Sequence, residues 1–73
     1  MLNIDTEPVL SSHISEIGYD EKTRVLRVVF NDGSMYDYDD VSKEIFTGLK
    51  QASSAGRYFK NYVKERYRFV RVE

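Results

Sequence analysis

The chain has 73 residues and a net charge of −1, and it contains no cysteine. A chain of this length forms a single domain, here residues 1–73, and without cysteine it can have neither a disulfide framework nor a thiolate zinc site. Its apolar runs are far shorter than the roughly 20 residues that span a bilayer, and its first residues lack a signal-peptide pattern. We therefore expect a cytoplasmic protein with no membrane partner. Because the sequence opens with Met1 and closes on a predicted strand, we also expect it to be complete.

The net charge conceals a strong asymmetry along the chain. Residues 1–49 hold ten acidic and four basic residues, whereas residues 50–73 hold seven basic and two acidic ones. The two parts thus carry net charges of −6 and +5. Either the two halves neutralise each other across the fold, or the second half gives one side of the domain a basic surface that suits a polyanion.

The first half of the sequence predicts strands. Residues 1–10 contain the only proline, Pro8, and we expect an extended N-terminal arm there. Strands are predicted over 14–19, 24–30 and 35–38, and the turn at residues 20–23 begins with Asp20, whose carboxylate can accept backbone hydrogen bonds. The segment 24–30 is the richest in β-branched residues, which favours the centre of the sheet.

The Asp32-Gly33 pair predicts a two-residue hairpin loop, because a type I′ turn needs positive φ at both positions. In that register Val29 lies opposite Tyr36, and Arg27 lies opposite Tyr38. Alternation along the strands then places Tyr36, Tyr38 and Arg27 on one face of the sheet. The other face, with Leu26, Val28, Phe30 and Met35, is the expected core. The tyrosine face is too apolar for bare solvent, so a chain segment, a partner or a ligand must cover it.

The second half predicts two helices, over about 42–52 and from Ala55 to about Glu65, followed by a short strand over 69–72. Asp39, Asp40 and Ser42 are the expected capping or dipole-complementing residues of the first helix, and Ser54 is the expected N-cap of the second. On a helical wheel the second helix has a basic stripe opposite an apolar stripe of Tyr58, Phe59, Tyr62 and Val63. Together the elements predict an α+β fold, a three-stranded antiparallel meander with two helices packed on it and a short C-terminal strand or extended segment.

Several short motifs occur in a specific order over residues 9–67. They are Val9-x-Ser11-Ser12-x-Ile14, Ile17-Gly18-Tyr19-Asp20, Leu26-x-Val28-x-Phe30-x-x-Gly33, Tyr36-x-Tyr38-x-x-Val41 and Ala52-x-Ser54-x-Gly56-x-Tyr58-Phe59. In these motifs the chain resembles the KTSC domain family, named for the C-terminal domain of some lysyl-tRNA synthetases and also found as free-standing proteins. It departs from the family at Ser42 and Ala55, where proline is common, and at Lys60-Asn61. The resemblance implies a small α+β domain and, from the synthetase context, a role in RNA binding.

Two groups of residues are candidates for binding nucleic acid. Arg57, Lys60 and Lys64 form the basic stripe, which Arg68 extends, and their spacing can follow a phosphate backbone. Ser54 and Gly56, at the start of the same helix, could seat one phosphate. The alternative for this stripe is an ordinary solvated helix face.

Tyr36 and Tyr38, beside Arg27, could stack unpaired bases. The alternative for the tyrosines is packing under a helix, with their hydroxyls reaching polar partners.

The sequence shows no catalytic site, cofactor fingerprint or metal-binding motif. His13 is the only histidine, and a lone imidazole without nearby ligands makes a poor metal site or catalytic base. Asp37, Asp39 and Asp40 lack the spacing of a calcium loop. We therefore expect a non-enzymatic module that needs no cofactor and binds RNA, either tRNA or a single strand. The alternative is a protein-interaction domain, an adaptor or inhibitor that uses its N-terminal arm and sheet edges.

Overall fold

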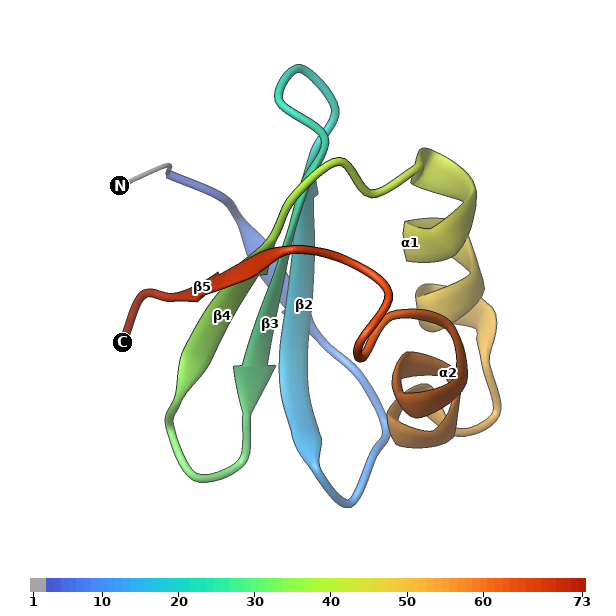
Figure 1. Ribbon diagram of the computed structural model, residues 1–73. Coiled ribbons are helices and arrows are strands. Elements are labelled where there is room, and N and C mark those ends of the chain that lie inside the picture. The colour runs from blue at the N-terminus through green and yellow to red at the C-terminus, as the bar shows by residue number, and fades with distance from the viewer. Residues whose placement is uncertain (1–2) are drawn as a thin grey trace.

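A computed structural model describes residues 3–73 and shows an antiparallel five-stranded sheet with two helices (Figure 1). The strands lie in chain order, β1-β2-β3-β4-β5. The elements are β1 (Thr6–Pro8), β2 (Ile14–Asp20), β3 (Val25–Phe30), β4 (Met35–Tyr38), α1 (Lys43–Gln51), α2 (Ala55–Tyr62) and β5 (Phe69–Arg71). The predicted α+β fold and its meander are confirmed, and the β-branched segment β3 is the central strand.

The sheet has more strands than the three-stranded meander of the prediction. Part of the expected N-terminal arm is β1, which pairs with β2 so that Glu7 lies opposite Ile17. Met1 and Leu2 of that arm lie outside the described residues. The predicted C-terminal strand is β5, which pairs with β4 at the other edge. The segment around Pro8 is consistent with an edge position, because proline has no N–H to donate to a second neighbour.

Ser42, one of the three candidates at the first helix, is the N-cap of α1, and the predicted N-cap Ser54 of α2 is confirmed. The Ser42 hydroxyl accepts a hydrogen bond from the Ile45 N–H at 3.4 Å, and the Ser54 hydroxyl accepts one from the Arg57 N–H at 3.3 Å. α2 ends at Tyr62, before the predicted boundary near Glu65. The chain turns there because Glu65 adopts a left-handed conformation, with a φ of 68°.

The hairpin between β3 and β4 differs from the prediction by one residue. The loop has three residues, Asn31 to Gly33, and is closed by a hydrogen bond from the Phe30 N–H to the Ser34 carbonyl at 2.9 Å. Gly33 alone in the loop has a positive φ, 91°, as in a type I turn followed by a bulge. Val28 therefore pairs with Tyr36 in place of Val29.

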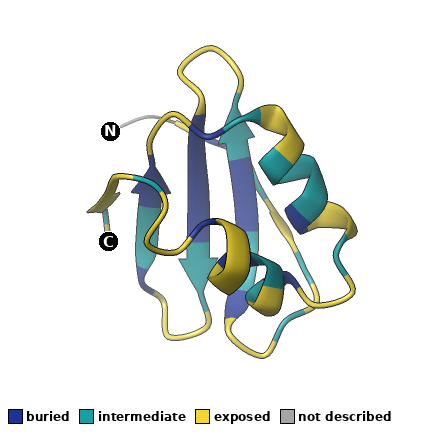
Figure 2. Cartoon of the chain, turned by 45° about the vertical axis from the view of Figure 1, so that its right-hand side comes forward, coloured by how far each residue is buried: buried dark blue, intermediate teal, exposed yellow. Residues whose placement is uncertain are grey.

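A shift of one residue reverses the faces of β4. Tyr36 and Tyr38 lie on the same face of the sheet as Leu26 and Val28, which is the face that the helices cover (Figure 2). The predicted division of the sheet was therefore wrong for β4. Met35, expected in the core, lies on the opposite face.

The core lies between this sheet face and the two helices. Its fully buried side chains include Ile17, Leu26, Val28, Leu49 and Val63. A bulge between Ile14 and Glu16 lets Ile14 also face the core, although it is three residues from Ile17. α2 contributes Ala55 and Phe59, and Val63 follows as its C-cap residue, a repeat of four that places all three on one side of the helix.

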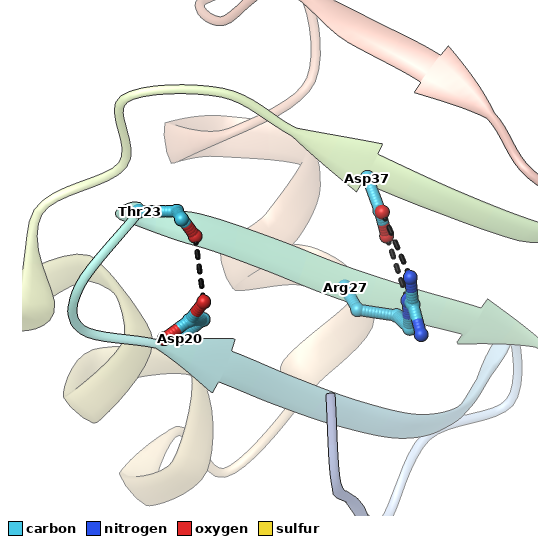
Figure 3. Close-up of polar contacts among 4 residues, drawn as sticks. All are labelled: Asp20, Thr23, Arg27 and Asp37. Carbon is cyan, nitrogen blue, oxygen red and sulfur yellow. Dashed lines mark hydrogen bonds and ion pairs between the residues drawn. The ribbon is translucent and has the colours of Figure 1, made fainter. Parts of the chain in front are cut away.

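The opposite face of the sheet carries a buried ion pair. Arg27 donates from Nε and Nη2 to the two carboxylate oxygens of Asp37, at 2.8 and 2.9 Å, across the β3–β4 pair (Figure 3). Both residues are buried, and the hydrogen bonds to Asp37 raise the pKa of Arg27 above its ordinary value. Gly18 lies opposite Arg27 on β2, and a Cβ at Gly18 would collide with the Asp5 carbonyl oxygen. The N-terminal segment thus passes close to the sheet here, and only glycine leaves it room.

The predicted turn at Asp20 is confirmed. Its carboxylate accepts hydrogen bonds from the Lys22 N–H at 3.2 Å and the Thr23 hydroxyl at 2.8 Å, and the second is drawn in Figure 3. α1 has nine residues and α2 eight, so within residues 3–73 neither helix is long enough to cross a bilayer.

Candidate nucleic-acid interface

Five aromatic rings meet where β3, β4, β5 and α2 come together. They belong to Phe30, Tyr36, Tyr38, Phe59 and Phe69. Tyr38 lies 5.4 Å from Phe59 and 5.6 Å from Phe69 between ring centroids, and Tyr36 lies 5.6 Å from Phe69. These separations are typical of aromatic pairs that attract each other.

The rings surround an open pocket of about 530 Å³, which we call the aromatic pocket. Its other lining residues are Ser34, Lys64 and Glu65. The volume lies within the range of ligand-binding pockets, about 300–1,000 Å³. The rings differ in exposure, because Tyr38 is only 5% exposed whereas Phe69 is 53% exposed. Burial, with a smaller contribution from Tyr36, raises the pKa of Tyr38 to about 12, so its hydroxyl is a neutral hydrogen-bond donor at physiological pH.

The aromatic pocket continues into two further pockets along α2. A middle pocket of about 390 Å³ shares Phe30, Phe59 and Lys64 with it. A polar pocket of similar volume shares His13, Gly56 and Lys60 with the middle one and is also lined by Arg57. Because each pocket shares residues with the next, the three form one trough that follows α2 from its C-terminal end to its N-terminal end.

Among residues 3–73, the cations of the trough have no carboxylate within salt-bridge distance. Within the part of the chain that the structure describes, the ion pairs involve Arg24, Arg27, Lys43 and Lys50. Arg57, Lys60 and Lys64 are exposed and lie in none of these pairs. Among the described residues, only Lys50 forms an ion pair between the basic second half and the acidic first half, with Glu7 at 3.4 Å. The two halves therefore do not neutralise each other at the trough.

The structure brings five of the predicted nucleic-acid contacts together. Arg57, Lys60 and Lys64 line one trough with Tyr36 and Tyr38. Of the two interpretations of the tyrosines, Tyr38 fits packing under a helix, since it is buried against Phe59. Tyr36 is half-buried and lies at the pocket wall.

Arg27 and Arg68 lie elsewhere. The prediction that Arg27 lies beside the tyrosines is wrong, because the hairpin register places it on the other face of the sheet, buried and paired with Asp37. Arg68 is exposed in the turn before β5, where its carbonyl accepts a hydrogen bond from the Asp39 N–H, and it does not line the trough.

The predicted phosphate seat lies at the far end of the trough. Ser54 and Gly56 both line the polar pocket. A Cβ at Gly56 would lie 3.0 Å from the Ser11 hydroxyl, so glycine at this position allows the segment before β2 to pack closely on α2. The ring of His13 lies beside the same glycine. Among residues 3–73 no three His, Cys, Asp or Glu side chains gather closely enough to hold a metal ion.

Sequence reasoning missed several residues of the trough. Phe30 and Phe59 were assigned only to the core, while Phe69, Glu65 and His13 received no binding role, although all five line the trough. Arg71 lies beside it, with its guanidinium 5.9 Å from the centre of the Tyr36 ring. The alternating pattern Phe69-Val70-Arg71 could have identified an aromatic and a cationic side chain on one strand face. Their position beside Tyr36 depends on β4–β5 pairing, for which the sequence holds no local signal.

Comparison with known proteins identifies the family. The model of the KTSC domain matches residues 10–67. This chain belongs to the KTSC domain family. A KTSC domain protein from Yersinia pestis has a crystal structure with a TM-score of 0.93 and 30% sequence identity, covering 97% of this chain and all of that one. An uncharacterized protein from Stutzerimonas stutzeri is 36% identical over 64 residues, which are 86% of this chain and 90% of that protein.

A KTSC domain also occurs within larger proteins. A lysine–tRNA ligase from Nostoc punctiforme is 33% identical over 61 residues, which are 84% of this chain and 11% of the ligase. The family resemblance expected from the ordered motifs is thus confirmed.

Proposed function

We propose that this KTSC domain binds single-stranded RNA along the trough. Bases stack in the aromatic pocket, and phosphates lie on Lys64, Lys60 and Arg57. The observation that carries the proposal is the continuity of an open aromatic pocket with a row of cations that form no ion pair with any carboxylate in residues 3–73. The polar pocket, with Ser54 and Gly56, offers a further place for a phosphate, and Arg68 is a candidate contact outside the trough.

Physical chemistry favours an unpaired strand over a duplex. Base stacking on an aromatic side chain contributes about 1–3 kcal/mol per base, and it requires a base whose face is free. Lys60 lies on α2 and Lys64 lies in the turn just after it, and both line the middle pocket, so the two cations can follow one chain of phosphates. A similar domain within a lysine–tRNA ligase supports RNA, and tRNA in particular, as the polyanion.

In this role the domain is a binding module and catalyses no reaction. We also propose that it acts in the cytoplasm, which fits its lack of cysteine.

Fluorescence anisotropy of labelled oligoribonucleotides tests the proposal. We expect saturable binding of single strands at low salt, weaker binding of a duplex of the same sequence, and a large loss of affinity for the double variant Lys60→Glu with Lys64→Glu. Lys22→Glu is a matched control, because Lys22 is exposed in the β2–β3 turn, away from α2 (Figure 1). Absence of saturable binding at low salt, or equal affinity of the double variant and the wild type, contradicts the proposal.

A protein ligand is the second candidate. β5 is an edge strand whose residues are all exposed, with Phe69 and Val70 at 53% and 56%. An exposed apolar edge can pair with an extended segment of a partner. A partner that stays bound through nuclease treatment and high salt, and is lost when Val70 is replaced by proline, supports this candidate over RNA.

A further inference from the structure

Among the described residues, Glu65 is the one carboxylate that lines the aromatic pocket. It adopts a φ of 68° just after α2, at a position where glycine is the usual residue. The other two non-glycine residues with positive φ among residues 3–73 are Arg24 and Asp40, which form an ion pair with each other at 3.3 Å. Within the same range Glu65 has no cation within salt-bridge distance. Among residues 3–73 the Glu65 carboxylate is thus a hydrogen-bond acceptor without a cationic partner, and it lines the aromatic pocket of an otherwise basic trough.

A carboxylate at this place selects among bases by hydrogen bonding. An ionised carboxylate only accepts hydrogen bonds, with two oxygens side by side. Guanine presents two adjacent donors, N1–H and N2–H₂, on its Watson–Crick edge, so both oxygens can be satisfied at once. Adenine and cytosine present one amino donor beside a ring-nitrogen acceptor, and uracil presents one N–H between two carbonyl oxygens. Each of these edges places an acceptor against the carboxylate.

From this complementarity we propose that the aromatic pocket selects guanine and that Glu65 is the residue that recognises it. The inference rests on the proposed binding of single-stranded RNA. Lys64 lines the same pocket, and its ammonium has three donors, so it can contact the O6 acceptor next to guanine N1–H while it also contacts a phosphate. The stacked rings hold the base while the two side chains contact its edge. Pairing of a carboxylate with two donors discriminates by roughly 5- to 150-fold against a base that cannot form it.

The test uses short single-stranded oligoribonucleotides that differ at one base, which is guanine, inosine, adenine, cytosine or uracil. Inosine keeps N1–H and O6 but lacks the N2 amino group, so it reports the second donor alone. We expect the wild-type protein to bind guanine most tightly and inosine at an intermediate level. Glu65→Gln and Glu65→Gly should reduce the ratio of guanine to inosine affinity to near one. Glycine suits the backbone at this position, so Glu65→Gly retains the fold.

Glu44→Gln on α1 is the matched control, since it removes an exposed carboxylate outside the trough and should leave the ratio unchanged. Equal binding of all five oligonucleotides by the wild type overturns the guanine inference but leaves RNA binding intact. A guanine preference that survives in both Glu65 variants shows that another residue recognises the base. Absence of binding to any of them refutes the inference together with the proposed function.

Discussion

Neutralising two cations of the trough should change the salt dependence of RNA binding by a calculable amount. Binding of a single strand releases about 0.7 counterion per phosphate contacted, so log K falls with log salt at about that slope per contact. If Arg57, Lys60 and Lys64 each contact one phosphate, the slope is about −2.1, and affinity falls about 18-fold between 50 and 200 mM salt. The double variant Lys60→Gln with Lys64→Gln retains one contact, for which the slope is about −0.7 and the loss about 2.6-fold.

The assay is anisotropy of a labelled single strand across a salt series, for the wild type, the double variant and Lys22→Gln. Lys22→Gln should keep the wild-type slope, because Lys22 is exposed but lies outside the trough. A double variant whose slope matches the wild type would show that the strand does not follow α2. A reduced slope in Lys22→Gln would show that charge acts over the whole surface and not through this row of cations.

Three further predictions concern the aromatic pocket and the sheet. Phe69→Ala should weaken single-strand binding by about 1–3 kcal/mol in anisotropy titrations, since it removes one stacking surface. Its thermal stability should change little because the ring is 53% exposed, and unchanged affinity would exclude Phe69 from the site. Asp37→Ala leaves the buried Arg27 guanidinium without its partner and should lower the free energy of unfolding in urea by about 3–5 kcal/mol. The double variant Arg27→Leu with Asp37→Leu should lose less of this free energy of unfolding. A loss below about 1 kcal/mol for Asp37→Ala would contradict the burial of this pair. Tyr38 holds its proton to a pKa of about 12, above its ordinary value of 10.0, so the unfolded chain ionises first. The contribution of Tyr38 to the free energy of unfolding is fully present below pH 10 and should fall as pH rises to about 12. In alkaline unfolding experiments Tyr38→Phe should abolish this contribution to the fall.

The sequence predicted the elements other than β1, but it did not predict the faces of the sheet. Ser42 and Ser54 predicted both helix starts, and the β-branched run of β3 predicted the central strand. The hairpin was located correctly but given a loop one residue too short. A type I′ turn and a type I turn with a bulge both place glycine at Gly33, so the dipeptide does not distinguish them. In the structure Asp32 accepts hydrogen bonds from the N–H and hydroxyl of Ser34, which supports the longer loop.

The one extra residue in the β3–β4 loop sets which side chains of β4 face the candidate site. Arg57 and Lys60 of the basic stripe could be predicted because they lie on α2 and depend only on helical periodicity, which is local, whereas Lys64 lies in the turn after the helix. The aromatic pocket could not, because it requires the register of β3–β4 and the pairing of β5 with β4 across more than thirty residues of chain. Arg27 was consequently placed beside the tyrosines, whereas Phe30 and Phe69 are the side chains that lie there.

Nuclear magnetic resonance mapping with a single-stranded oligoribonucleotide tests most directly whether RNA occupies the trough. Ring protons of Tyr36 and Phe69 and amide protons from Arg57 to Lys64 should shift as the oligonucleotide is added, while β1 and the β2–β3 turn stay unchanged. Shifts confined to β1 or to the turn at Asp20, with the aromatic signals unmoved at saturation, would contradict the account.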